Sequence, residues 1–205
     1  MKIKTFLALL SLGCMSFAVV AQQPTLQQIT QQLAIPQIMQ CQFQQQRFLS
    51  GLAKPLKASG VMVLDQQIGV ALSQQKPFAQ VTAITTNKLI QSINQQKQVI
   101  SEQEQPQLFH ITNLLFSLFQ GQFTSVSDYF TLTQQTQNKQ QWFITLLPKQ
   151  SPFNQLFQQI KLEGEKHIQV VDIIDKQQDR TLLTFEHCQP IEKLNNEQQQ
   201  WFKTE

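Results

Sequence analysis

Apolar and polar residues alternate along most of this sequence, a pattern typical of strands that pack one face on an apolar core. Three such runs follow one another between residues 41 and 78. The first covers 41–48, the second is led in by Gly60 and covers 61–64, and the third covers 68–72. Glycine and proline residues separate the runs, as they do in turns. The pattern therefore predicts an antiparallel meander at the start of the chain.

The same alternation continues through the rest of the sequence. Strands are expected over 78–86 and 88–93 with a turn at Asn87, over 98–101, and over 130–137, 141–149 and 156–164. Residues 167–175 and 180–187 are expected to form a hairpin. In its first strand, alternation would place Ile168, Val170 and Asp172 on one side and Val171 and Ile173 on the other.

Helical spacing of apolar residues appears in two places, 25–35 and 106–120. Pro106 and Gly121 are typical start and stop residues for the second helix. Its leucines recur at intervals of three and four, with Phe109 and Phe119 on the flank. So wide an apolar arc indicates a helix that is buried on most sides or that covers something apolar. A short helical piece is expected over 125–130, and a polar tail could dock through Trp201 and Phe202.

These elements show no alternation of strand and helix, so a parallel sheet is not expected. The fold class predicted is mainly β (α+β): one large, curved antiparallel sheet of about ten strands, with two or three helices on one face.

The first residues predict export. Lys2 and Lys4 precede an apolar run of about 16 residues, and the small residues Val19 and Ala21 follow. We expect a signal peptide over 1–21, cleaved after Ala21, and a single domain over 22–205. A membrane anchor is the alternative, but the run is shorter than the roughly 20 residues that a span needs. Lipidation at Cys14 is a further alternative, for which the preceding residues fit poorly.

Charge and composition exclude some partners. The chain has 16 basic and 13 acidic residues, and two of the basic residues lie in the signal peptide. The exported domain is therefore close to neutral and shows no basic cluster, so a nucleic-acid partner is not expected. The many glutamines alternate with apolar residues, which assigns them to the solvent-facing sides of strands and helices.

Two cysteines, Cys41 and Cys188, remain after cleavage. In an exported chain, two thiols near opposite ends of the domain suggest a disulfide, which we expect here. Two separate buried thiols are the alternative.

Residues for catalysis are few. The three histidines, His110, His167 and His187, do not have metal-ligand spacing, and no nucleophile or nucleotide-binding motif is present. Asp172 and Asp175 could pair for acid–base chemistry, although Asp175 also fits the start of a hairpin turn. The sequence therefore predicts a non-enzyme without metal or cofactor, and an exported hydrolase is the least supported hypothesis.

An apolar sheet face beneath an apolar helix has two interpretations. It can be ordinary core, or it can enclose a cavity that holds lipid. Composition does not choose between them. Arg47 shares the strand side of Phe43 and Gln45, and its five donors could latch a lid by bonding carbonyls at a helix end. The alternative is an arginine at the edge, in water.

Several segments resemble the LolA family of periplasmic lipoprotein carriers. They are Phe43-x-Gln45, Gly60 before a strand, a strand ending before Lys76-Pro77, the run FITLLPK at 143–149, and the strand and hairpin over 156–187. Together they cover roughly residues 37–187, and the likeness is to a divergent branch of the family.

The resemblance implies an incomplete antiparallel β-barrel whose helices form a lid over the concave face. It implies a monomer in the periplasm that shields acyl chains of lipoproteins or lipids and moves them toward the outer membrane. Inner-membrane donor and outer-membrane acceptor proteins would be its partners. The side chains expected to line the cavity are Phe43, Val61, Val63, Val70, Leu72, Phe78, Leu108, Ile111, Leu114, Leu115, Leu118, Trp142, Ile144 and Leu146. A non-enzymatic envelope interaction module with a solid core is the alternative.

The chain departs from the family after its second strand. Where other members carry an Arg-Pro pair and then an aromatic-rich strand, this chain has Gln66-Gln67 followed by Ile-Gly-Val-Ala at 68–71. The arginine thought to hold the family's lid shut is therefore missing at that place. Arg47 is the candidate substitute.

Overall fold

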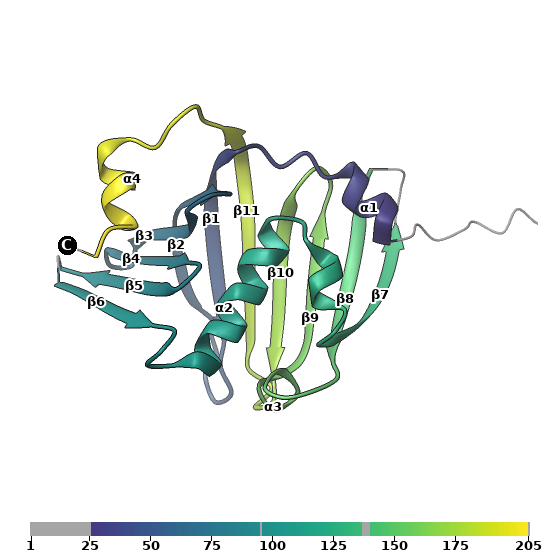
Figure 1. The fold of residues 1–205 in the computed structure, drawn as a ribbon. Helices are drawn as coiled ribbons and strands as arrows, with labels where there is room; N and C mark the ends of the chain where they lie inside the picture. Colours follow the sequence, from purple (N-terminus) through teal and green to yellow (C-terminus); the bar gives the residue numbers. More distant parts are fainter. Residues whose placement is uncertain (1–25, 95, 137–139, 205) are drawn as a thin grey trace, which may run out of the picture.

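The strands of this protein form one open antiparallel sheet (Figure 1). The structure, a computed structural model, describes residues 26–94, 96–136 and 140–204. In this part of the chain eleven strands follow one another in the order β6-β5-β4-β3-β2-β1-β11-β10-β9-β8-β7. The predicted signal peptide, the first residue of the helix expected over 25–35 and the last residue of the strand expected over 130–137 lie outside the described residues.

The strands lie where the alternating segments of the sequence predict them, although β2 begins at Leu56 and not at residue 61 as expected. The strands are β1 (Ile38–Phe48), β2 (Leu56–Asp65), β3 (Gly69–Lys76), β4 (Gln80–Thr85), β5 (Lys88–Ile93), β6 (Gln96–Ser101), β7 (Phe130–Thr136), β8 (Trp142–Pro148), β9 (Phe157–Gly164), β10 (Ile168–Asp175) and β11 (Arg180–Pro190). The helices are α1 (Leu26–Gln32), α2 (Pro106–Phe119), the 3-10 helix η1 (Phe123–Val126), α3 (Phe153–Leu156) and α4 (Asn196–Trp201). The prediction of a mainly β fold, an incomplete barrel with helices, is confirmed.

The sheet consists of two meanders that meet at β1 and β11. Strands β1 to β6 lead away from this junction in chain order, and β7 to β11 lead back to it. Every other pair joins strands that are neighbours in the sequence, so the β1–β11 ladder alone connects the two halves of the described sheet. Its register runs from Met39 opposite Pro190 to Phe48 opposite Arg180.

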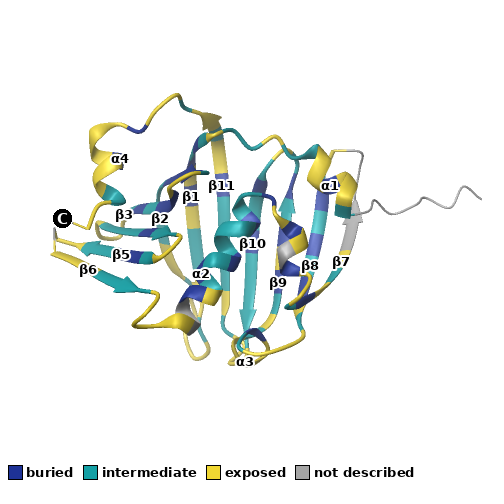
Figure 2. Cartoon of the chain, in the orientation of Figure 1, coloured by how far each residue is buried: buried dark blue, intermediate teal, exposed yellow. Residues whose placement is uncertain are grey.

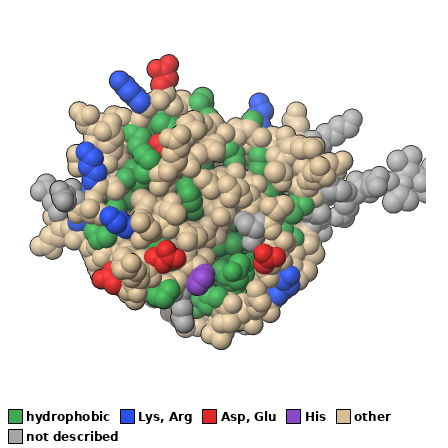
Figure 3. Space-filling view, viewed as in Figure 1, with side chains coloured by type: hydrophobic (Ala, Val, Ile, Leu, Met, Phe, Trp, Pro, Cys, Tyr) green, Lys and Arg blue, Asp and Glu red, His purple; other side chains and the backbone are tan. Residues whose placement is uncertain are grey.

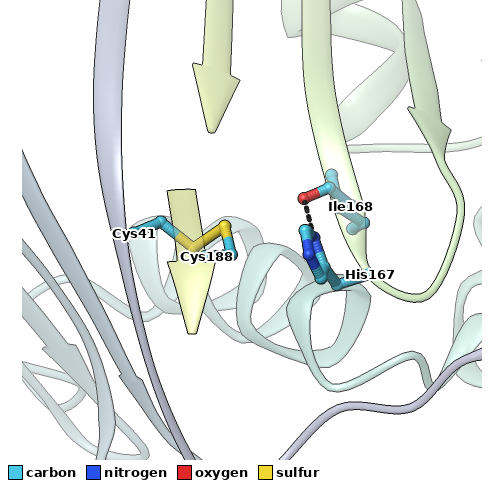
Figure 4. The surroundings of a disulfide bond; sticks show 4 residues. All are labelled: Cys41, His167, Ile168 and Cys188. Atoms are coloured by element: carbon cyan, nitrogen blue, oxygen red, sulfur yellow. Dashed lines mark hydrogen bonds between the residues drawn. A yellow bond between two sulfur atoms is a disulfide. The ribbon is translucent and has the colours of Figure 1, made fainter. Parts of the chain in front are cut away.

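A disulfide crosses this junction. Cys41 of β1 is bonded to Cys188 of β11, a sequence separation of 147 residues, as the sequence led us to expect (Figure 4). The ladder is irregular beside it, between Gln40 and Gln42. There β11 contains one residue more than β1, and His187 adopts a positive φ of 51°. The bulge accommodates the extra residue and leaves the two cysteines side by side.

The two faces of the sheet carry different helices. The main core lies on the concave face, where Met39, Cys41 and Phe43 of β1 pack beneath α1, α2 and η1 (Figures 1 and 2). A small second cluster lies on the other face, where Trp201 and Phe202 at the end of α4 pack on Ala71, Ala83 and Ile90. The expected docking of the tail is confirmed. Helix α4, which belongs to the tail and not to the two or three helices expected on one face, packs on the opposite face, because Ala71 alternates with the core residues Val70 and Leu72 and so points the opposite way.

Three details of the strands differ from the predictions. Gly60 lies inside β2 and not before it. Only glycine fits at this place in the strand, because a Cβ would meet the Ser73 carbonyl oxygen at 1.9 Å. In β10 a bulge between Ile168 and Val170 shifts the alternation. Ile168 and Val171 are consequently both buried in the main core, although strict alternation put them on opposite sides. The helical piece expected over 125–130 is η1, a few residues earlier.

The junction generates a prediction about stability. Replacing both cysteines (Cys41→Ser with Cys188→Ser) should lower the free energy of unfolding by about 4–5 kcal/mol, because the unfolded chain loses a very long closed loop. The measurement is denaturant unfolding of the variant and of the wild type, each with and without reductant. Reductant should lower the midpoint of the wild type to that of the variant and leave the variant unchanged. Equal midpoints for oxidised wild type and variant would contradict the prediction.

Candidate functional site

Helix α2 crosses the concave face diagonally, in front of β1, β11 and β10 (Figure 1). Pro106 opens the helix, and Gly121, with a φ of 74°, follows its end, as predicted. Most of its described side chains are buried or half-buried, and His110 is exposed. Phe109, which was expected on the flank of the apolar arc, is completely buried. The wide apolar arc thus reflects a helix enclosed on most sides.

The interior beneath the C-terminal part of α2 is packed. Leu114 and Leu118 are buried in the main core together with residues from both halves of the sheet. The ring of Phe119 meets Phe185 of β11 edge to face at a centroid distance of 5.3 Å. Further along the same core, Phe123 of η1 contacts Trp142 in a similar way at 5.8 Å.

Many of the side chains expected to line a lipid cavity are therefore core. Seven are buried members of the main cluster: Phe43, Val70, Leu114, Leu118, Trp142, Ile144 and Leu146. Leu72, Ile111 and Leu115 are half-buried and pack against that cluster. The structure brings these ten residues together on the concave side.

The other four expected residues have different positions. Val61 and Val63 point to the opposite face, because the core residues Met62 and Leu64 alternate with them along β2. The run 61–64 is apolar at every position, so its pattern does not indicate which of its residues face the core. Phe78 is 58% exposed at the start of the β3–β4 connection. The side chain of Leu108 lies outside the described part of the structure.

An open groove lies on the concave side, at the end of the sheet where β1 and β3 finish and β2 and β4 begin. Its volume is about 640 Å³. We name this pocket the β1–β4 groove. It is lined by Phe43, Gln45, Arg47, Pro55, Leu56, Lys57, Ala58, Leu72, Gln74, Pro77, Phe78, Gln80 and Thr82. Phe43 belongs to the main core and Leu72 packs against it, so the floor of the groove is continuous with the core.

The polar side chains on the β3–β4 side of the groove bond to the protein itself. Gln74 donates to the Phe78 carbonyl oxygen at 2.9 Å, which ties the connecting loop to β3. Gln80 donates to the Thr82 hydroxyl at 3.4 Å. The wall that carries Phe78 and Pro77 is therefore held by its own hydrogen bonds.

Arg47 does not act as a lid latch in this structure. It lies at the exposed end of β1, on the groove side, and makes no hydrogen bond or ion pair with any described residue. Arg47 cannot hold the helix from this position, because the groove that it lines is formed by residues of the strands and their connections and by no described side chain of α2. Within the described part of the chain, the expected bond from Arg47 to a helix-end carbonyl is absent.

The C-terminal end of α2 is held instead by two glutamines. Gln120 donates to the Gln66 carbonyl oxygen at 3.0 Å, in the turn between β2 and β3. Gln66 in turn donates to the carbonyl oxygens of Ile35 and Pro36, both at 2.9 Å. Gln66 occupies the place where the resemblance implies an arginine, so an uncharged amide ties the helix there. The sequence pattern indicated that an arginine is missing at this place, but it did not indicate that the Gln66 amide forms these hydrogen bonds.

A second, more exposed groove lies between the start of α2 and α3. Its volume is about 510 Å³, and its lining includes Pro106, Ile111 and Leu156. Glu104 stands at its edge, where the Ser101 backbone N–H and hydroxyl donate to its carboxylate and lower its pKa. Hydrophobic side chains gather at the surface in the lower part of this face (Figure 3).

The residues considered for acid–base chemistry or metal binding make hydrogen bonds within the local structure. Asp172 accepts two hydrogen bonds from Arg180, and this bonding raises the pKa of the guanidinium. Asp175 accepts from the backbone N–H groups of Gln177 and Asp179 and so closes the β10–β11 turn. His167 contacts the Ile168 carbonyl oxygen through Nδ1 at 3.2 Å (Figure 4). Over the described ranges, no group of three or more potential metal ligands gathers, and no helix has the length and apolarity to cross a membrane.

Comparison with known proteins yields likenesses of structure. No family model matches the chain, and no curated protein sequence does. A LolA superfamily protein from Nitrosomonas europaea is similar over 87% of this chain and 96% of its own, with 9% identity and a TM-score of 0.47. An outer membrane lipoprotein-sorting protein domain from Vibrio parahaemolyticus is similar over 83% and 92%, with 9% identity and a TM-score of 0.46. A chain of the MucA/MucB complex of Pseudomonas aeruginosa is similar over 84% of this chain and 60% of its own, with 10% identity and a TM-score of 0.44. At these identities the likeness concerns the fold alone.

The packed interior generates a prediction that separates core from surface on α2. Leu118→Ala should lower the free energy of unfolding by about 2–5 kcal/mol, since it leaves a hole in a side-chain cluster where Leu118 is only 2% exposed. His110→Ala, on the exposed side of the same helix, should change it by about 0.5 kcal/mol or less. Denaturant unfolding of the two variants measures both values. A small effect of Leu118→Ala would show that the helix does not seal the core there.

Proposed function

We propose that this protein is an exported carrier that holds an acyl chain of a lipid or a lipid-anchored protein in the β1–β4 groove. The observation that carries the proposal is the groove itself, an open site with an apolar floor on the concave face. Its volume of about 640 Å³ falls within the range of about 300–1,000 Å³ that is usual for small-molecule sites.

Burial of hydrocarbon supplies the binding energy in this proposal. Each methylene group removed from water contributes about 0.8 kcal/mol. Phe43, Leu56, Ala58 and Leu72 offer apolar surface from three adjacent strands, and the exposed Phe78 extends it at the rim. Because the groove is open along one side, a chain bound there stays partly in contact with water. Partial burial suits a carrier, since the cargo must also leave.

The lining of the groove supports binding without a reaction. It contains no histidine, cysteine, aspartate, glutamate or serine among the described residues. Its uncharged polar groups on β3 and β4 already bond within the protein. The one hydroxyl of the described lining, that of Thr82, accepts a hydrogen bond from the Gln80 amide and has no histidine or carboxylate beside it in the lining to act as its base.

The signal peptide predicted over 1–21 assigns the proposed carrier a compartment. An exported chain with a disulfide between Cys41 and Cys188 suits the periplasm, where such bonds persist. In that compartment the carrier would take its cargo from a donor at the inner membrane and deliver it to an acceptor at the outer membrane.

A second candidate function is a non-enzymatic interaction module of the cell envelope. The observation that favours it is the filled core beneath α2, where most of the residues expected to line a cavity pack against one another. Native mass spectrometry of the protein purified from periplasm separates the two functions. Bound lipid or lipopeptide supports the carrier. A protein without lipid that also takes up no fluorescent fatty acid supports the interaction module.

A pair of neighbouring substitutions in β2 tests the groove. Ala58→Trp should fill it and weaken the binding of a fluorescent fatty acid at least tenfold, because a chain that loses two methylene contacts already loses about that much. Ser59→Trp is the matched control, since residue 59 points to the opposite face of the same strand. Fluorescence titration of both variants gives the affinities.

The outcomes of this titration are distinct when circular dichroism shows both variants folded. Weaker binding in Ala58→Trp alone supports the groove as the site. Unchanged binding in Ala58→Trp would place the acyl chain elsewhere and remove the basis of the proposal.

A further inference from the structure

The concave side of β1 changes from apolar to polar along its length. Cys41 and Phe43 lie in the core, and the next two residues on the same side are Gln45 and Arg47. Both line the β1–β4 groove, Gln45 half-buried and Arg47 exposed at the end of the strand. Their Cα atoms are about 7 Å apart along the strand. An apolar floor thus ends at two adjacent hydrogen-bond donors.

These two side chains have no partner in the described protein. Neither the Gln45 amide nor the Arg47 guanidinium makes a hydrogen bond or ion pair with a described residue, whereas Gln74 and Gln80 of the same groove do. The cross-strand neighbours of Gln45 are Ala58 and Leu183, and those of Arg47 are Leu56 and Thr181. No acidic side chain is among these neighbours or in the described lining, so the positive charge of Arg47 is not neutralised there.

We propose that Gln45 and Arg47 bind the phosphate headgroup of an acyl lipid whose chain lies on Phe43 and Leu72. The proposal rests on the function proposed above and adds the chemistry of the cargo. The guanidinium offers five N–H donors in a planar fork that matches two phosphate oxygens, and the amide offers two more.

The arrangement favours a phosphate lipid over other anionic partners. The floor that leads to Arg47 is formed by Phe43, Leu72 and Ala58, which offer no hydrogen-bonding side chain to a peptide backbone. A phosphate has more acceptor oxygens than a fatty-acid carboxylate and can accept from Gln45 and Arg47 together. The order of surfaces along β1, apolar and then cationic, is the order of chain and headgroup in such a lipid.

The experiment compares ligands that share a chain and differ in headgroup. Myristoyl-lysophosphatidylglycerol, monomyristoylglycerol and myristate each displace a bound fluorescent fatty acid, below their micelle concentrations and at low salt. The wild type should bind the phosphate lipid about tenfold more tightly than the uncharged glycerol ester, as expected for a charge-assisted contact. Arg47→Gln should reduce this ratio to near one, and Arg47→Lys should restore part of it. Lys161→Gln, which removes an exposed charge from β9 outside the groove, is the control and should keep the wild-type ratio.

Each outcome decides one question. A wild-type ratio near one, an unchanged ratio in Arg47→Gln, or a preference for myristate over the phosphate lipid would overturn the headgroup site, while the acyl groove would stand. Failure of the wild type to bind any of the three ligands would overturn the proposed function itself. Thermal unfolding of each variant shows whether a lost ratio reflects a lost fold.

Discussion

The pairing of β1 with β11 is the interaction on which the rest of this structure depends. It joins strands from opposite ends of the described chain, whereas all other ladders join neighbours in sequence. A contact between residues so far apart costs much chain entropy, and the Cys41–Cys188 bond reduces that cost in the unfolded state. Without this ladder the concave face would be two separate sheets. The core beneath α2 would then also divide, because Phe43 and Phe185 lie opposite each other across the junction.

The position of α2 follows from that core and determines where a ligand could bind. Leu114 and Leu118 pack in the main core, and Phe119 contacts Phe185 edge to face. At its C-terminal end the helix is tied to the β2–β3 turn through Gln120 and Gln66. The concave surface at the other end of β1–β4 keeps a groove whose floor is an extension of the core. Packing and ligand binding thus use the same apolar surface, one part beneath the helix and the other at the open end of the strands.

Charged residues are rare in this chain, so a charged residue that lines the groove is unusual. Charged residues are only 14% of the sequence, and glutamine takes the positions of β1 that face away from the main core, residues 40, 42, 44 and 46. On the other side of the same strand, Arg47 lies beyond an apolar run and has no acidic neighbour in the described ladders. A cation in such surroundings is less screened by protein charges and can contribute to the choice of an anionic ligand.

The sequence by itself determined the elements of this protein and their order. Period-two alternation fixed the strands to within a few residues, and Pro106 and Gly121 fixed the ends of α2, because these signals are local to the chain. It also indicated the Cys41–Cys188 pair and the unusual position of Arg47. Only the tertiary structure decided which apolar residues are core and which line an open surface, since both kinds look alike in a pattern of hydrophobicity. It placed Val61 and Val63 on the face opposite to the expected one, because an uninterrupted apolar run does not show which of its residues face the core. It placed Ile168 on the same side as Val171, because the bulge in β10 shifts the alternation. It also placed α4 on the opposite face and gave the tie of α2 to Gln66, because these contacts join residues that are distant in sequence and come together only when the sheet is formed.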